Sequence, residues 1–359
     1  MLANLPRPLT RPRFGAAVAI AALLAASLGA CGKSADDAAA EVAAAAAAAE
    51  KSKEAPPEVP VTWPLTGLPG DVVERPALAV KVENAKAARP QSGLEQADVV
   101  WEEMVEGGES RFIAVFNSQT PDSVGPVRSV RPMDGPILGA TGGLLACSGG
   151  QDRFLKQTKE AGLQVLTEDS GNAGFYRSSE RSAPHNLYLK PAATWEQADD
   201  AHQGPPPGEF VFADSAGAAS AARDGRPAST LAVTISAAAK PTWTWDESTK
   251  TYLRSERDVP SESAAGVRLA AHNVIALTVR IEMAGGTDAA GSPIPDTKIV
   301  GSGAGVVVSG GKALDVEWSK ASERDPLVLR TPDGAEAKLA PGVTWIELVP
   351  SGEGTWVVS

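Results

Sequence analysis

Cysteine is nearly absent from this chain of 359 residues, which contains only Cys31 and Cys147. If Cys31 serves another purpose, as its surroundings suggest, Cys147 has no partner within the chain. An exported protein of this kind cannot then depend on an intramolecular disulfide. Hydrophobic cores must hold it together, and a chain of this length can supply two of ordinary size.

Histidine is also scarce, with three residues, and the motifs of common enzyme classes are missing. The sequence has no zinc-type pairing of Cys or His, no Gly-x-Ser-x-Gly elbow and no complete phosphate-binding loop. Ser309-Gly310-Gly311-Lys312 has the spacing of a Ser-x-x-Lys nucleophile, but its glycines are typical of a hairpin turn. The sequence therefore indicates no metal and no cofactor, and it favours a binding role over catalysis.

No segment provides the roughly 18 to 20 apolar residues of a transmembrane helix. The longest apolar run, residues 14–28, follows Arg7, Arg11 and Arg13 and is typical of a secretory signal. The run ends in Leu28-Gly29-Ala30-Cys31, which resembles a lipobox, where the thiol takes a lipid and the chain is cut before the cysteine. An ordinary signal peptide with a chance cysteine is the alternative.

This pattern predicts a lipoprotein signal peptide at residues 1–30 and an Ala-rich and Pro-rich tether at residues 31–60. The protein would be extracytoplasmic, held by lipid on Cys31 to the outer face of the cytoplasmic membrane or, in a cell with two membranes, to the other one. Removing residues 1–30 takes away three arginines and no acid, so the formal charge changes from -11 to -14. Such a chain is not expected to bind nucleic acid over its general surface.

Residues 61–207 predict an N-terminal α+β domain with a mixed sheet. Residues 77–83 alternate apolar and polar side chains, as a strand does, and residues 98–105 and 111–117 indicate a hairpin. An apolar run at residues 143–147, a Ser-Gly-Gly turn and a helical pattern then predict a βα unit.

Residues 210–359 predict a mainly antiparallel β domain, which follows a boundary with three consecutive prolines at residues 205–207. Short β-type runs alternate with turn chemistry, as at residues 309–312 and 331–334. This region holds five of the eight tryptophans. They could form a sugar-binding platform, but tryptophan in strands more often packs in a core.

Six arginines in Pro-rich or Gly-rich stretches are the main candidates for a site: Arg89, Arg111, Arg128, Arg131, Arg177 and Arg181. Rigid loops that present planar, permanently charged groups are suited to phosphate or carboxylate. Residues 123–191 hold eight Lys and Arg against six Asp and Glu, so this region is positive in an acidic chain. Alternatively, these arginines form ion pairs with Glu102, Glu103, Glu106, Glu109 and Glu180.

Ser148, Gly149 and Gly150 precede the predicted helix and could add backbone donors to an anion site. Asn186 adjoins His185, which lies in a Pro-fixed loop and could act as a general base or as a structural hydrogen-bonding group. Glu102 and Glu103 are consecutive on a strand and must point to opposite faces, so only one of them could work with His185.

The chain resembles the YerB-like lipoproteins, a family of bacterial surface proteins built from two domains of unknown function. The resemblance spans about residues 63–356, and its most specific motifs are Ala88-Arg89-Pro90-Gln91-Ser92-Gly93-Leu94, Gly125-Pro126-Val127-Arg128-Ser129 and Ala183-Pro184-His185-Asn186-Leu187-Tyr188. It implies an anchored envelope protein with an N-terminal and a C-terminal domain that meet near residue 210. It implies no particular reaction.

Three functions follow as hypotheses. The first is a lipid-anchored module whose N-terminal domain binds an anionic envelope ligand through the arginines. The second is a hydrolase or transferase of envelope polymers that uses His185 with a carboxylate. The third is a structural lipoprotein that binds an envelope protein. Convergence of Arg89, Arg128, Arg131 and Arg181 without a carboxylate near His185 would favour binding, and a carboxylate within hydrogen-bond reach of His185 in an open cleft would favour an enzyme. Dispersed arginines would leave only the structural role.

Overall fold

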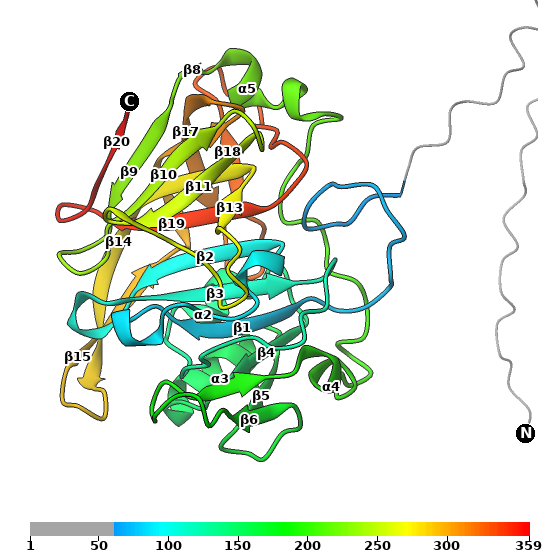
Figure 1. The fold of residues 1–359 in the computed structure, drawn as a ribbon, viewed down its shortest axis with the longest axis vertical. Helices are drawn as coiled ribbons and strands as arrows, with labels where there is room; N and C mark the ends of the chain where they lie inside the picture. Colours follow the sequence, from blue (N-terminus) through cyan, green and yellow to red (C-terminus); the bar gives the residue numbers. More distant parts are fainter. Residues whose placement is uncertain (1–60) are drawn as a thin grey trace, which may run out of the picture. The chain divides into compact units, whose positions relative to one another are not determined.

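The computed structural model describes residues 61–359, and the predicted signal peptide, Cys31 and the tether lie outside the described residues. The described part is mostly β-sheet. Figure 1 shows strands from the start of the chain and strands from its end running through the same central sheet.

The large sheet contains twelve strands. Its main path follows the order β18 (Val328–Arg330), β17 (Lys312–Lys320), β16 (Gly301–Ser309), β14 (Asn273–Thr287), β19 (Thr344–Pro350), β2 (Val99–Met104), β3 (Ser110–Phe116), β1 (Leu78–Glu83), β4 (Leu144–Cys147) and β5 (Gln164–Thr167). Off this path, β15 (Pro293–Lys298) pairs with β14, and β8 (Arg226–Pro227) pairs with β17.

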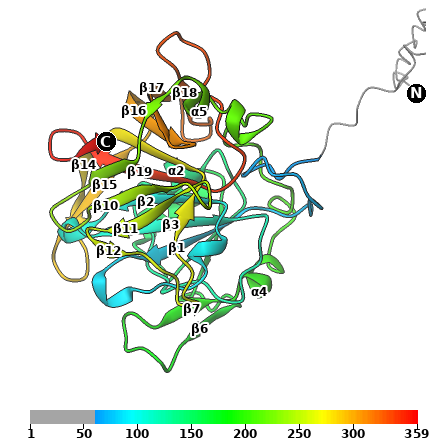
Figure 2. The same ribbon diagram turned by 45° about the horizontal axis from the view of Figure 1, so that its top comes forward.

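A smaller sheet covers one face of the large one, as the turned view in Figure 2 makes clearer. Its order is β12 (Val259–Pro260), β11 (Thr251–Glu256), β10 (Pro241–Asp246), β9 (Thr230–Thr234) and β20 (Thr355–Val358), with β13 (Ala270–Ala271) paired to β11. Strands β6 (Phe175–Arg177) and β7 (Leu187–Leu189) form a separate ribbon.

The helices are short. They are α2 (Asp134–Leu138), α3 (Asp152–Glu160), α4 (Pro191–Trp195) and α5 (Ser220–Asp224), with single 3-10 turns η1 (Lys86–Ala88), η2 (Leu94–Gln96), η3 (Glu106–Gly108) and η4 (Ala216–Ala218). Within the described residues none of these helices is both long enough and apolar enough to span a bilayer.

Several local predictions agree with the structure. The hairpin is β2 and β3, which pair antiparallel around η3. The βα unit is β4 followed by α3, and the Ser-Gly-Gly-Lys turn connects β16 and β17. Trp243, Trp318 and Trp345 are buried, as expected of core residues.

The second half departs from a purely antiparallel pattern at one place. β19 pairs parallel with β14 on one side and parallel with β2 on the other. A parallel neighbour requires a long crossover, and here the chain between β14 and β19 supplies it by way of β15 to β18. Because β2 comes from the first half, one continuous sheet joins the two halves of the chain.

Two hydrophobic cores lie on the two faces of this sheet, and both draw on both halves of the chain. One contains Phe112 with Trp243 and Trp345, and the other contains Trp101 with Ile346. The sequence pattern of β1 has an apolar and a polar face, and all six residues of β1 are buried. Lys81 and Glu83 are therefore inside the protein, under the loops of the first half, and need partners.

Candidate functional site

One face of the first-half sheet carries four ionisable side chains in adjacent positions. Lys81 and Glu83 are two residues apart on β1 and so point the same way. In the strand register, Arg111 of β3 lies opposite Glu83 on one side and opposite Glu103 of β2 on the other. Strand pairing thus brings together residues that are far apart in sequence.

The deepest part of this face is a buried triad of Lys81, Glu103 and Asp134. The Lys81 ammonium donates to Glu103 and, at 2.7 Å, to Asp134 at the start of α2. None of the three side chains is exposed. Burial and the neighbouring Asp134 raise the pKa of Glu103 to about 8, although Lys81 acts in the opposite direction.

Nearer the surface lies a second group, which we call the outer cluster: Glu83, Glu106, Arg111, Arg128, Arg131 and His185. Glu83 is its centre, 2.8 Å from His185 Nδ1 and 3.3 Å from Arg128 Nε. Arg131 contacts both oxygens of Glu106, at 2.5 Å and 2.8 Å. The contact at 2.8 Å, from Arg131 Nη2 to Glu106 Oε2, is a charge-assisted hydrogen bond.

Arg111 is the least compensated member of the outer cluster. It donates to the Ser129 carbonyl oxygen at 3.1 Å and lies 4.0 Å from Glu106. Burial, followed by the charges of Arg131 and Arg128, lowers its pKa to about 10. An arginine held among two others is a place where an anion would relieve repulsion.

The outer cluster holds one more positive than negative side chain. The positive groups are Arg111, Arg128 and Arg131, and the negative groups are Glu83 and Glu106. The carboxylates are nearly covered, whereas the side chains of Arg128 and His185 are each 27% exposed. Positive and polar groups therefore form the outer side of the cluster.

The chain around Arg128 explains why it lies there. Residues 125–132 run alongside β1, where Arg128 N–H donates to the Lys81 carbonyl and the Pro126 carbonyl accepts from Glu83 N–H. On its other side the segment receives the β7 strand, since Val127 N–H donates to the Leu187 carbonyl. Because His185 lies just before β7 in the sequence, this pairing places its imidazole beside Glu83.

The remaining predicted arginines lie elsewhere. Arg177 pairs with Glu168 at 3.0 Å and donates to the Asn186 side-chain oxygen. Arg181 donates to the Ala87 and Pro90 carbonyls, and Arg89 donates to Asn84. The structure thus brings together Arg111, Arg128, Arg131 and His185, and it leaves Arg89, Arg177, Arg181 and Asn186 outside this group.

The expected ion pairs are found only in part. Glu106 does pair with an arginine, but Glu83, which the sequence did not suggest, is the partner of Arg128 and His185. Glu103 pairs with a lysine instead. The alternation of Glu102 and Glu103 along β2 is confirmed, because they enter different clusters.

The Ser148, Gly149 and Gly150 turn is occupied by an acidic side chain. A side chain at Gly149 would collide with the carboxylate of Asp169, whose backbone N–H donates to the Ser148 carbonyl. Ser148 Oγ lies 3.0 Å from Ser129 Oγ and so adjoins the outer cluster. A carboxylate at this turn competes with any anion at the start of α3.

The sequence did not reveal a second charge cluster, on the opposite face of β2. We call it the inter-half cluster: Glu102, Arg254, Glu256, Glu347 and Trp243. Arg254 Nη2 donates to Glu102 at 2.7 Å and to Glu256 at 2.9 Å, and Trp243 Nε1 donates to Glu347 at 2.8 Å. The sequence gives only a weak signal for this cluster. Arg254 and Glu256 are two residues apart, which places both charges on the same face of a strand, and nothing else distinguishes them.

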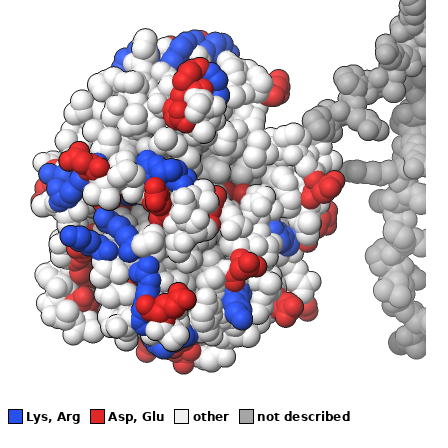
Figure 3. Space-filling view, viewed as in Figure 1, with Lys and Arg blue, Asp and Glu red and all other residues white. Residues whose placement is uncertain are grey.

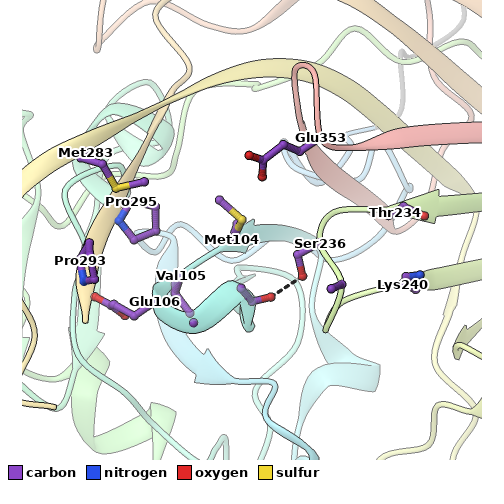
Figure 4. Close-up of a pocket in the computed structure, with 13 residues that line it drawn as sticks. Met104, Val105, Glu106, Thr234, Ser236, Lys240, Met283, Pro293, Pro295 and Glu353 are labelled. Atoms are coloured by element: carbon purple, nitrogen blue, oxygen red, sulfur yellow. Dashed lines mark hydrogen bonds between the residues drawn. The ribbon is translucent and has the colours of Figure 1, made fainter. Parts of the chain in front are cut away.

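The largest of the described pockets, about 450 Å³, lies at the tip of the β2–β3 hairpin (Figure 4). Met104 and Met283 flank it, with Lys240 and Glu353 at its edges. Of the outer cluster only Glu106 reaches it. His185 lines none of these four pockets, and of the Glu83 and His185 pair only the imidazole reaches the surface.

Residues 61–359 contain no group of three or more His, Cys, Asp or Glu placed to hold a metal ion. Cys147 is buried, and burial raises the pKa of its thiol to about 12, which suits a core residue and not a nucleophile.

Figure 3 shows basic and acidic side chains intermixed on the face in view, with no broad area of one sign.

Comparison with known proteins gives a consistent result for both halves. Residues 65–204 match the family described as "Protein of unknown function (DUF3048) N-terminal domain", and residues 231–346 match its C-terminal domain. A protein of Bacillus subtilis (strain 168), YerB, whose name describes it as an inferred lipoprotein, is 28% identical over 296 residues. That alignment covers 80% of this chain and 86% of YerB.

The fold is also similar to an experimental structure. The crystal structure of the Bacillus subtilis YerB protein superimposes with a TM-score of 0.70 at 25% identity, over 83% of this chain and 99% of that one. The two matched regions lie on either side of the Pro-rich stretch near residue 205. The chain therefore belongs to the YerB-like family, with the N-terminal and the C-terminal domain both present.

Proposed function

We propose that this protein is a lipid-anchored, extracytoplasmic binding module that holds an anionic group of the cell envelope at the outer cluster. Cys31 would carry the lipid, as the lipobox-like sequence and the name of the YerB relative suggest. Residues 31–60 would form the tether, and residues 61–207 and 210–359 would form an α+β domain and a β domain. A Cys31→Ala variant that still shows normal mature mass and lipid labelling would contradict the anchor.

The observation that carries the binding proposal is the asymmetry of the outer cluster. Its carboxylates lie inside, each with a side chain 6% exposed, and its accessible groups are Arg128 and His185. With Nδ1 of His185 directed at Glu83, Nε2 is left for an external partner. A phosphate or carboxylate oxygen at the Arg128 guanidinium would gain a charge-assisted hydrogen bond, and Nε2 of His185 would donate to it as well when the imidazole is protonated at both nitrogens.

The experiment is a thermal melt of the protein with added anions. Inorganic phosphate or pyrophosphate should raise the melting temperature, and linkage gives about 2.7 kcal/mol of stabilisation at a hundred times the dissociation constant. Sodium chloride at matched ionic strength controls for screening, which acts on all charges alike.

Two variants localise the effect. Arg128→Gln should remove the anion response, because the accessible guanidinium is lost. Arg177→Gln is the matched control, since Arg177 is also a surface arginine paired with a glutamate but lies outside the outer cluster. Anion responses of equal size in both variants would rule out this site.

The contact of 2.8 Å between His185 and Glu83 favours a second candidate, a hydrolase in which the carboxylate orients the imidazole as a base for water. Among the described residues no hydroxyl or thiol hydrogen-bonds to His185, so a water-based reaction is the form this candidate takes. Release of product from envelope polymers by the wild type, abolished in His185→Gln and retained in Arg177→Gln, would favour it over binding alone.

A further inference from the structure

A pocket of about 250 Å³ lies between the two halves of the protein, where the chain after β1 meets β11 and β12. The first half contributes Arg89, Gln91 and Phe112, and the second contributes Arg254, Glu256 and Leu269. No member of the outer cluster lines it. It is therefore a separate place for a ligand.

Arg89 forms the basic side of this pocket. Its Nε and Nη2 donate to the Asn84 carbonyl at 3.0 and 2.7 Å, and Nη2 lies 3.6 Å from Glu256. Its Nη1 donates to no acceptor within residues 61–359. The side chain is 29% exposed, and burial lowers its pKa even though Glu256 opposes this effect. The guanidinium is thus fixed in place with donors to spare.

Glu256 forms the acidic side. Its Oε1 accepts from Lys240 N–H at 2.7 Å, and its Oε2 accepts from Arg254 at 2.9 Å. A carboxylate has about four acceptor sites, so some remain. Arg254 is held on its other edge by Ser261, whose Oγ accepts at 2.9 Å.

Positive and negative charges both lie around the pocket and are separated in space. Arg89 and Arg254 face Glu102 and Glu256, and the exposed Glu262 adds one more negative charge at the rim. Glu347 behind them has a pKa raised well above its ordinary value by burial and by Glu102. A purely anionic ligand on Arg89 would meet the nearby Glu256 carboxylate. A purely cationic ligand on Glu256 would meet Arg89. A ligand that carries both charges avoids both conflicts.

The size and the walls of the pocket limit the ligand further. Drug-sized ligands use pockets of roughly 300 to 1,000 Å³, so a volume of about 250 Å³ suits something smaller. Apolar side chains, namely Pro90, Phe112, Val259, Pro260 and Leu269, supply much of the lining.

We propose that this pocket binds a small zwitterion with an apolar side chain, either a free amino acid or the end of a short peptide. The carboxylate of the ligand accepts from Arg89 Nη1, and its ammonium group donates to Glu256. The apolar side chain lies against the wall formed by Val259 and Leu269. Both sources share this chemistry, and their sizes distinguish them.

The test is isothermal titration of the full chain, solubilised with its anchor in detergent, with four probes. These are alanine, the dipeptide Ala-Ala, N-acetylalanine, which lacks the ammonium group, and alaninamide, which lacks the carboxylate. Alanine or Ala-Ala should bind saturably, and whichever is tighter identifies the source. The other two should bind roughly tenfold to a hundredfold more weakly, since each loses a charged hydrogen bond.

Two variants place the binding in this pocket. Arg89→Gln should weaken binding of the better probe by roughly tenfold or more. Val259→Trp should block the pocket without disturbing the core, because Val259 is 68% exposed at its edge. Arg177→Gln is the control and should bind as the wild type does.

Specific results would overturn the proposal. No saturable binding of any probe to the wild type, or unchanged binding to Val259→Trp, would exclude the pocket. Equal affinity for N-acetylalanine and alanine would exclude the zwitterion. None of these results bears on the anion site at Arg128, and loss of that site leaves this proposal intact.

Discussion

Glu102 and Glu103 are neighbours on β2, yet their side chains enter charge clusters that differ in almost every respect. Glu103 points into the first half, joins Lys81 and Asp134, and lies beneath the outer cluster. Glu102 points to the smaller sheet and meets Arg254 from the second half. The alternation of a strand thus assigns adjacent carboxylates to opposite faces of one sheet.

The inter-half cluster is closed around Arg254. Arg254 is 1% exposed, and its guanidinium lies over the rings of Phe112 and Trp345 while it pairs with two carboxylates. Burial alone would lower its pKa, but Glu102 and Glu256 more than compensate, so the pKa is raised. Arg254, which is buried and remains charged, therefore stabilises the contact between the halves.

The outer cluster is open on one side, because Arg128 and His185 reach the solvent. Its three arginines also outnumber its two carboxylates, so it carries a surplus of positive charge. Both clusters satisfy buried charges, but only the outer cluster has an accessible arginine of its own, whereas the inter-half cluster offers an external partner the Glu256 carboxylate at the edge of its pocket. A binding site is therefore expected where buried charges are incompletely paired, and not wherever arginines are numerous.

The largest effect is expected from separating the halves. Residues 210–359 expressed alone should fold as a β domain with a cooperative melt, but at a lower temperature than the full chain. Without β2, the edge of β19 is unpaired and Arg254 loses Glu102. Circular dichroism against temperature measures this. A spectrum with no cooperative transition would contradict the boundary at residue 210.

Next in size is the substitution Arg254→Met. It leaves Glu102 and Glu256 buried with one partner fewer, and breaking a buried pair in this way costs about 3–5 kcal/mol. Urea unfolding measures the change in free energy. Arg226→Met is the control, because Arg226 pairs with Asp315 at the surface and should cost under about 1 kcal/mol. Similar losses of unfolding free energy in the two variants would show that the inter-half cluster does not stabilise the contact between the halves.

The sequence predicted local features better than it predicted the pairing of strands that are distant in sequence. The alternation in residues 77–83 and the glycines between β2 and β3 were enough to predict a strand and a hairpin. Local patterns do not report that β19 inserts between β14 and β2, because the parallel pairs join strands distant in sequence.

The same limit applies to the candidate site. Loop chemistry indicated Arg128, Arg131 and His185, but Glu83 was missed because it continues the polar face of a strand that the sequence portrays as half exposed. Its importance comes from the loops that cover β1. The positions of Arg177 and Arg181 depend on where each loop turns, which residue type alone does not specify.

The third prediction concerns pH and the buried triad. The pKa of Glu103 is raised from an ordinary 4.5 to about 8, so the folded protein binds a proton that the unfolded chain releases between these values. Stability from this group therefore falls as pH rises from about 5 to 8. Glu103→Gln, which cannot ionise, should show a flatter dependence of the unfolding free energy on pH. Parallel curves for the variant and the wild type would mean that Glu103 is charged when folded.

The smallest effect on stability is expected at Arg128, and it provides the sharpest contrast with Arg254. Arg128→Gln removes a partly exposed guanidinium from Glu83, which keeps His185 at 2.8 Å. A pair of this exposure contributes about 1 kcal/mol or less, so urea unfolding should barely change while the response of the melting temperature to phosphate disappears. Arg254→Met should show the reverse, a large loss of stability with the phosphate response retained in the folded fraction. If Arg128→Gln instead destabilises the protein as strongly as Arg254→Met, the outer cluster is structural in the same way, and its open side has no role in binding.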